Sequence, residues 1–130
     1  MKKVAVDFDG FLTTASVKCR SWIPDRLYQV VLVLYKPKPK FTNILRIQRW
    51  RKAGKKIIII SARPELTRGV TKDWLKENNV LVDELVLVGT NDIKSEKWKA
   101  LKRREINYYY GNNFDTIIFL LKKGINAFLN

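Results

Sequence analysis

The sequence predicts an α/β fold in which helices cover both faces of a central parallel sheet, giving a three-layer α/β/α sandwich. Short runs of β-branched and other apolar residues alternate with amphipathic segments of helical spacing, as is typical of parallel sheets with right-handed connections. The run "KIIII" at residues 56–60 is almost entirely apolar, as in a strand buried on both faces. A length of 130 residues favours a single domain over 1–130 with its own core.

The first strand is expected in "KKVAVDF", residues 2–8, which ends in turn chemistry at Gly10. Residues 13–40 fit more than one structure. The segment at 23–36 fits a helix with Pro24 in its first turn, which we favour, or a strand or hairpin favoured by its valines. The sequence "KPKPK" at 36–40 is expected to form a stiff linker, because proline fixes its own φ and restricts the residue before it.

The remaining elements follow from apolar periodicity and from helix start and stop signals. Thr42 is a good N-cap, and the helix after it, over 43–53, places Ile44, Ile47 and Trp50 on one stripe before Gly54 ends it. Beyond the strand at 56–60, helices are expected over 64–78, 95–104 and 114–123, and strands over 84–89, 106–111 and 125–129.

Charge and composition narrow the classes of function. The formal net charge is +14, and residues 36–56 hold nine basic residues and no acid. This surplus fits binding to a polyanion such as nucleic acid, and equally a solvated surface. The chain has no His and one Cys, Cys19, which excludes an internal disulfide and Cys/His zinc sites. Its apolar runs are too short to span a bilayer, and "MKK" leads directly into a strand pattern, so we expect a cytoplasmic protein without membrane contact.

Polar residues follow four of the predicted strands at the point where each strand ends. They are Asp7 and Asp9, the segment 61–63, the segment 89–92 and the segment 111–115. Each has an ordinary structural explanation: Ser61, for instance, would cap the following helix, and Asp115 would be a first-turn acid. Because ligands of such folds bind beyond the carboxyl ends of the strands, the four together predict a functional site at one edge of the sheet.

The residue types at this edge suit phosphoryl transfer. Strand alternation sends Asp7 and Asp9 to the same side, and their mutual repulsion demands a nearby cation such as Mg²⁺. One carboxylate can then attack phosphorus while the second donates or accepts a proton. Ser61 and a lysine would neutralise the transferring phosphoryl oxygens.

Three segments resemble motifs of the haloacid dehalogenase superfamily: "DFDGFL" at 7–12, "IIIISARPE" at 57–65 and "GNNFD" at 111–115. The resemblance implies a Rossmann-like fold with a minimal cap, residues 13–40 forming a short flap or miniature cap. It also implies a Mg²⁺-dependent phosphatase in which Asp7 is the nucleophile, Asp9 the general acid and base, and Ser61 a phosphate ligand. The metal would be held by Asp7, the backbone carbonyl of Asp9, Asp115 and the residue at position 112.

At two positions the match to the family motifs is incomplete. The lysine of the third motif is open between Lys94, Lys97 and Lys99; we favour Lys94, 18 residues before Asn112, and expect the other two to join the basic surface. At Asn112 the family usually has an acid, and an amide offers a carbonyl oxygen without charge. We therefore expect weakened metal binding, and the alternative function is a catalytically impaired protein that acts as a basic nucleic-acid-binding module.

The segment after the second motif is similar to that of polynucleotide kinase phosphatase domains and nucleotidase-like members. The resemblance implies substrate contacts from Arg63 and Arg68, together with Gly10 and Ala62. With the positive charge, it favours a nucleotide or nucleic-acid-end phosphate as substrate. The tyrosines of "NYYYG", residues 107–111, suggest base stacking or packing within a strand, and we favour packing.

Overall fold

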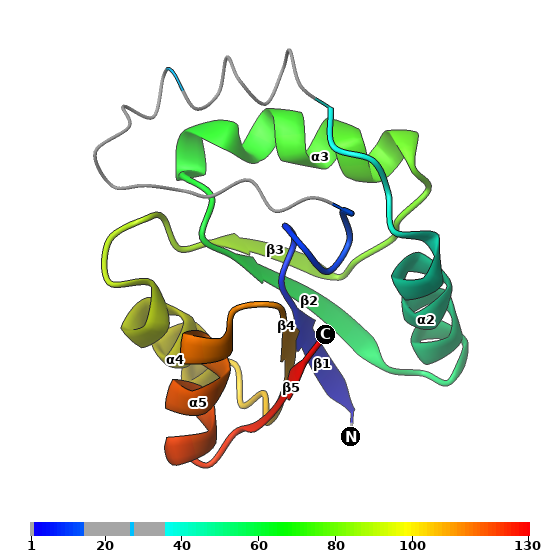
Figure 1. The fold of residues 1–130 in the computed structure, drawn as a ribbon. Coiled ribbons are helices and arrows are strands. Elements are labelled where there is room, and N and C mark those ends of the chain that lie inside the picture. Colours follow the sequence, from blue (N-terminus) through cyan, green and yellow to red (C-terminus); the bar gives the residue numbers. More distant parts are fainter. Residues whose placement is uncertain (1, 15–26, 28–35) are drawn as a thin grey trace.

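The computed structural model describes residues 2–14, 27 and 36–130. Apart from residues 27 and 36, the helix expected over 23–36 therefore lies outside the described residues, as does most of the predicted flap. Five parallel strands form one sheet in the order β3-β2-β1-β4-β5 (Figure 1). The strands are β1 (Lys3–Val6), β2 (Lys56–Ser61), β3 (Glu84–Leu87), β4 (Tyr108–Gly111) and β5 (Asn126–Leu129).

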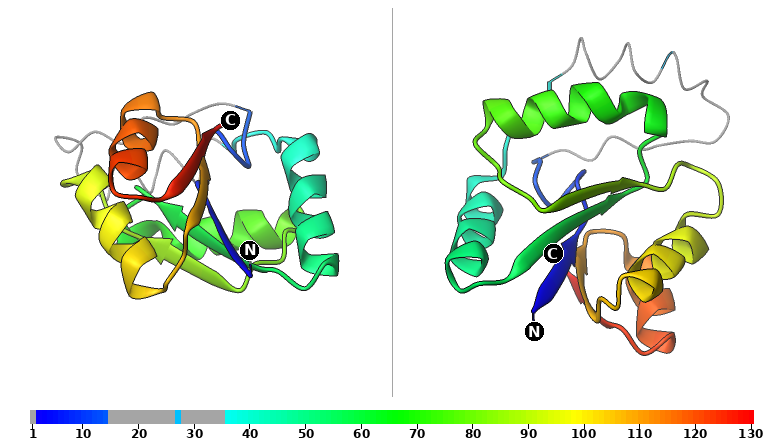
Figure 2. Two further views of the ribbon diagram at one scale, coloured as in Figure 1. Left: turned by 90° about the horizontal axis from the view of Figure 1, so that it is seen from below. Right: turned by 180° about the vertical axis from the view of Figure 1, so that it is seen from behind.

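Helices cover both faces of the sheet, which confirms the predicted α/β sandwich. They are α2 (Phe41–Lys52), α3 (Arg68–Glu77), α4 (Ile93–Arg103) and α5 (Phe114–Lys122), with a short 3-10 helix, η1 (Glu65–Thr67), leading into α3. Figure 2 shows α2 and α3 on one side of the sheet and α4 and α5 on the other. Among the described residues, no helix combines the length and apolar character needed to cross a membrane.

Two apolar cores separate the three layers, because alternate residues of each buried strand point to opposite faces. On one face, Val4, Val6 and Ile57 pack with Ile47 of α2 and Trp74 of α3. On the other face, a second set joins the sheet to α4 and α5; it comprises Ala5, Ile58, Ile60, Ala100, Leu101, Ile106, Tyr109, Ile117, Leu120, Ile125 and Ala127. The isoleucine run of β2 thus contributes to both cores, as its lack of polar residues predicts.

Helix starts differ from the sequence expectation in three places. The helix expected from residue 64 begins as the 3-10 helix η1 at Glu65 and becomes α-helical at Arg68. Helix α2 begins at Phe41, with Lys40 as its N-cap and no side-chain cap, so the assignment of Thr42 as N-cap is wrong. The carbonyl of Lys40 accepts hydrogen bonds from the backbone N–H groups of Asn43 and Ile44, so the helix starts two residues earlier than expected. Helix α4 begins at Ile93 rather than at residue 95.

Within the segment 36–40, Pro39 forms an antiparallel bridge with Thr13 and Lys40 is extended. Hydrogen bonds also join the segment to the turn that follows β1. Thr14 N donates to Lys38 O at 2.9 Å, and Lys40 N donates to Leu12 O at 2.7 Å. Trp74 of α3 donates from its indole Nε1 to Pro37 O at 2.8 Å. The linker expectation is therefore right in its extended conformation, while its hydrogen bonds tie it to the edge of the sheet where β1 ends.

Candidate functional site

Asp7 is the first residue beyond β1, and its position is fixed from three directions. Its backbone N donates to Tyr110 O of β4 at 2.9 Å. Its carboxylate Oδ1 accepts from the backbone N of Phe8 at 2.8 Å, and its Oδ2 lies 3.3 Å from Lys97 Nζ. The chain places β2 and then β3 on one side of the central strand β1, and β4 and then β5 on its other side. Asp7 therefore lies where the strand order reverses, the topological switch point at which such folds bind ligands.

The lysine beside Asp7 is Lys97, so the preference for Lys94 is corrected. Lys97 Nζ also donates to the Tyr109 hydroxyl at 2.8 Å, and its side chain is buried. Lys94 is exposed, and Lys99, also exposed, pairs with Glu96. Helical phase could have shown this: residue 97 lies one turn before the buried Ala100 and Leu101, on the face of α4 that packs against the sheet.

The electrostatics of this pair follow from its burial. Burial raises the pKa of Asp7, opposed by Lys97 and assisted by the neighbouring Asp9. Burial alone would lower the pKa of Lys97, but the Asp7 carboxylate and the Tyr109 hydroxyl outweigh it and raise that pKa above its usual range. Burial likewise raises the pKa of Tyr109, so its hydroxyl stays protonated while it accepts the hydrogen bond from Lys97. The result is a lysinium directed at Asp7.

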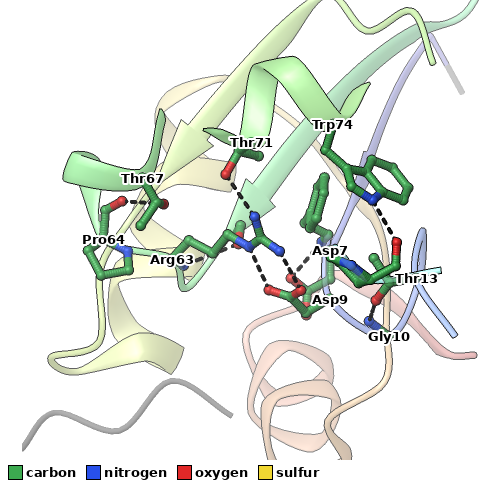
Figure 3. A network of polar contacts seen from close by, with 12 residues as sticks. Asp7, Asp9, Gly10, Thr13, Arg63, Pro64, Thr67, Thr71 and Trp74 are labelled. Carbon is green, nitrogen blue, oxygen red and sulfur yellow. Dashed lines mark hydrogen bonds and ion pairs between the residues drawn. The ribbon is translucent and has the colours of Figure 1, made fainter. Parts of the chain in front are cut away.

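Asp9 has a cation of its own in Arg63, which follows β2 (Figure 3). Arg63 Nε donates to Asp9 Oδ2 and Nη2 donates to Oδ1, both at 2.9 Å. Arg63 Nη1 donates to Thr71 Oγ1 of α3 at 2.9 Å, and the guanidinium carbon lies 4.1 Å from the centre of the Phe8 ring. The Arg63 side chain is only 2% exposed, so its expected role as a substrate ligand is corrected: its guanidinium is occupied by protein groups.

These contacts give each of the two aspartates a positively charged side chain as its partner. The sequence led us to expect that Asp7 and Asp9 would need a shared inorganic cation to remain charged side by side. In the structure Lys97 faces Asp7 and Arg63 faces Asp9, so side chains of the protein supply both opposite charges. A divalent cation is therefore not required to hold the two carboxylates in place.

The other residues of the second motif are arranged around Arg63. Ser61, at the end of β2, is buried and its Oγ accepts from Arg63 N at 3.1 Å, while Ala62 between them is half-buried. Arg68 points elsewhere: it pairs with Glu65 and donates from Nη1 to Leu85 O at 2.9 Å. The structure therefore brings Ser61 and Ala62 to the edge of the sheet next to Arg63 and gives Arg68 a different set of partners.

Gly10 and Asn112 lie against each other across the edge of the sheet. Gly10 has φ +88°, and a Cβ at this position would lie 1.8 Å from Asn112 Nδ2. A side chain at residue 10 would therefore be strained in its backbone and would displace Asn112. The absence of a side chain lets the amide of Asn112 approach the turn that carries Asp7 and Asp9.

Asp115 does not join the two aspartates. It is exposed in the first turn of α5, whose N-cap, Asn113, accepts a hydrogen bond from Thr116 N at 3.0 Å. Within residues 2–14, 27 and 36–130, no group of three or more His, Cys, Asp or Glu side chains is placed to hold a metal ion. The three carboxylates therefore form no cluster, and the expected part of Asp115 in the magnesium site is corrected. The donors that remain of the expected set are the carboxylate of Asp7, the backbone carbonyl of Asp9 and the amide of Asn112. This set suits a cation such as Mg²⁺, which keeps several waters and takes one or two protein carboxylates.

Comparison with known proteins gives similarity at the level of structure. No family model matches the sequence, and no curated protein matches it. A chain in the structure of the Pnkp1/Rnl/Hen1 RNA repair complex superposes with a TM-score of 0.74 and 17% identity, over 99% of this chain and 42% of that one. A chain in a second structure of the Pnkp1/Rnl/Hen1 complex gives a TM-score of 0.71 and 16% identity, over 100% and 46%. The protein spans less than half the length of these neighbours and shares their α/β fold.

Proposed function

We propose that the protein is a phosphomonoesterase in which Asp7 attacks phosphorus, and that its substrate is a phosphorylated nucleotide or nucleic-acid end. The observation that carries the proposal is the buried Asp7 at the switch point of the sheet, with Lys97 Nζ 3.3 Å from its Oδ2. A carboxylate in this place is within reach of a ligand at the sheet edge, and an adjacent ammonium suits a phosphoryl group.

Each residue has a defined task in this reaction. An Asp7 oxygen forms a bond to phosphorus as the bond from phosphorus to the leaving oxygen breaks, and water then hydrolyses the acyl phosphate. Lys97 stabilises the charge on the phosphoryl oxygens. Asp9 is the candidate for proton transfer to the leaving oxygen and from water, and its bidentate contact with Arg63 fixes the orientation of its carboxylate.

Mg²⁺ is the proposed cofactor, with Asp7, Asn112 and the backbone carbonyl of Asp9 as its protein ligands. When bound, it would supply positive charge to the phosphoryl oxygens. Asn112→Asp adds a charged ligand, so we expect the Mg²⁺ concentration for half-maximal activity to fall about tenfold. The matched control is Asn113→Asp, which adds the same charge one residue along and keeps a residue suited to the N-cap. An equal effect of both substitutions would contradict the role of Asn112.

The substrate class rests on charge and on the structural neighbours. The net charge of +14 and the acid-free run of basic residues at 36–56 give sequence-independent affinity for phosphates. Chains of the same fold belong to an RNA repair complex, which supports a phosphorylated nucleic-acid end over a small metabolite.

The decisive experiment is hydrolysis of a chromogenic aryl phosphate with and without Mg²⁺, comparing the wild-type protein with Asp7→Asn. Asparagine keeps the shape of the side chain and removes the nucleophile, so we expect activity to fall to background. Equal turnover by the two proteins would contradict the enzymatic function.

The second candidate is a nucleic-acid-binding module without activity. The neutral Asn112 and the occupied Asp9 carboxylate favour it. Binding of oligonucleotides without hydrolysis of any phosphate, by wild type or Asn112→Asp, would select this candidate.

A further inference from the structure

A row of aromatic side chains lies on the sheet face that carries α2, beside the candidate site. The rings of Tyr110 in β4 and Phe128 in β5 are stacked, with centroids 4.7 Å apart and planes inclined by 20°. Trp50 of α2 continues the row, with its centroid 5.1 Å from that of Tyr110. The row therefore joins three elements that are far apart in the sequence, and the pairing of Tyr110 with Phe128 across β4 and β5 fixes its register.

Arg46 adds a cation to this aromatic row. Its guanidinium carbon lies 5.1 Å from the centroid of Tyr110 and 5.5 Å from that of Trp50. Its Nη1 donates to Asn130 Oδ1 at 3.2 Å. A guanidinium held over aromatic faces is a planar, charged group that contacts both phosphates and base rings.

The outer end of the row is open to solvent. Helix α5 lies on the other face of β5, where Ala127 is buried, whereas Phe128 on the aromatic face is 41% exposed. Trp50, Tyr110 and Arg46 are each partly exposed. Because β5 is an edge strand of the sheet in the described part of the chain, no further strand covers the outer side of Phe128, and its exposed ring surface is accessible to a ligand.

The row also adjoins the catalytic edge. The carbonyl of Tyr110 accepts the backbone N–H of Asp7, and the backbone N of Asn130 donates to Gly111 O at 2.7 Å. The Tyr110 ring lies 6.3 Å, between centroids, from Phe11 in the turn that follows Asp9. A nucleic-acid strand with its terminal phosphate at Asp7 would therefore reach the aromatic row with the nucleotides next to that phosphate.

We propose that Trp50, Tyr110 and Phe128, with Arg46, form a base-stacking surface for a single-stranded nucleic acid whose end enters the site at Asp7. This deepens the proposed function, and its reference to Asp7 rests on that function. The charge of α2 selects the ligand. Its first turn holds no acid, and its last turn holds Arg49 and Lys52 beside Arg51, which pairs with Asp83, so the helix keeps a positive surplus that suits a polyanion. The aromatic faces select bases, because stacking on exposed rings contributes to single-strand binding whatever the sequence.

The test measures binding of an unphosphorylated, dye-labelled single-stranded oligonucleotide to the full chain without Mg²⁺, by fluorescence anisotropy. We expect Phe128→Ala to weaken binding about fivefold or more, and Phe128→Trp to retain it. Leu129→Ala is the matched control, since it removes the next exposed apolar side chain, which alternates to the other face of β5. We expect it to leave binding unchanged.

An oligonucleotide of the same length with abasic residues isolates the stacking contribution. We expect the wild-type protein to bind it more weakly, and Phe128→Ala to cause no further loss. Equal affinity of wild type for the abasic and the complete strand would overturn the proposal. So would a loss with Leu129→Ala as large as that with Phe128→Ala, or competition by polyglutamate at charge-equivalent concentration as effective as by the oligonucleotide, which would indicate an acidic protein as ligand.

Failure of the proposed function has a separate signature. A wild-type protein that hydrolyses no phosphomonoester but shows base-dependent binding sensitive to Phe128→Ala would contradict the function and support the stacking surface. Hydrolysis through Asp7 combined with binding that is insensitive to bases would support the function and overturn the stacking surface.

Discussion

At the scale of single residues, Asp7 is under two opposing influences. Burial raises the pKa of its carboxyl, and Lys97, 3.3 Å away, lowers it. In the proposed reaction the carboxylate of Asp7 has to be ionised to attack phosphorus. Lys97 would then have two tasks: it would favour the ionised form of Asp7, and it would face the charge of the phosphoryl group. Lys94, which sequence spacing favoured, does neither, because it is exposed in the first turn of α4.

Lys97→Met tests this division of roles. We expect kcat/KM for an aryl phosphate to fall about a hundredfold or more, as when one preorganised charged contact is removed from an active site. Lys97 lowers the pKa of Asp7, so its loss raises that pKa and the acidic limb of the pH–rate profile moves to higher pH. Lys94→Met is the control and should retain both activity and profile. Comparable losses in the two variants, measured by steady-state kinetics across pH, would contradict the assignment.

The ion pair of Asp9 and Arg63 is a second residue-scale feature with a measurable consequence. Arg63→Met leaves a buried carboxylate without its partner, and we expect the free energy of unfolding to fall by about 3–5 kcal/mol. Adding Asp9→Asn to that variant should recover part of the loss, because the unpaired charge is then removed. Urea denaturation of the two single variants and the double variant measures the coupling.

The control for these Asp9 and Arg63 variants is Lys36→Met, which removes an exposed ion pair with Glu77. Such pairs contribute about 0–1 kcal/mol. Additive effects of the Asp9 and Arg63 substitutions would mean that the bidentate contact does not stabilise the fold.

At the scale of elements, periodicity in the sequence predicted strands and helices well but misplaced their ends. The apolar run of β2 and the stripe of Ile44 and Ile47 in α2 report the buried face directly, because that face must be apolar. Helix starts depend on backbone hydrogen bonds as well as on side chains. Lys40 has no capping side chain, yet it starts α2 because its carbonyl is placed for Asn43 and Ile44. Thr42 carries the sequence signal without the geometry.

The two kinds of helix start make a matched pair for measurement. Asn113 caps α5 by accepting from Thr116 N, so Asn113→Ala should lower the free energy of unfolding by about 1 kcal/mol. Thr42 makes no cap hydrogen bond in α2, so Thr42→Ala should change stability by less than about 0.5 kcal/mol. Urea denaturation of both variants, with the midpoints compared at a constant m-value, measures the two changes in the free energy of unfolding. A larger cost at Thr42 would show that the sequence signal had been correct.

The sequence predicted where the candidate site lies, but it did not predict which side chains pair with one another there. Asp7, Asp9 and Ser61 were found because strand ends can be read from apolar runs, and parallel strands bring those ends to one edge. The burial of Arg63 was not visible, since an arginine after a strand fits a ligand contact as readily as an internal ion pair. Its partners Asp9 and Thr71 lie 54 positions before it and 8 after it, a juxtaposition that only the folded chain creates.

At the scale of the whole molecule, strand order places the proposed chemistry and the proposed binding surface side by side. With β1 in the centre of the sheet, Asp7 has β2 on one side, which carries Ser61, and β4 on the other, which carries Tyr110. Strand β5 then extends the sheet beyond β4 and supplies Phe128. A ligand that enters at Asp7 is thus flanked by an aromatic face within the same sheet, close to the basic helix α2.

The net charge of +14 and the aromatic row make different contributions to binding, and salt separates them. Affinity for a single strand falls with salt because phosphate contacts release counterions, with a slope of about −0.7 in log K against log salt for each phosphate neutralised. Arg46→Gln removes one cation and should make the slope shallower by up to about 0.7. Phe128→Ala removes no charge, so it should lower affinity equally at every salt concentration and leave the slope unchanged. Anisotropy titrations over a range of KCl concentrations measure both quantities. A change of slope with Phe128→Ala, or an unchanged slope and affinity with Arg46→Gln, would show that the strand follows another path across the molecule.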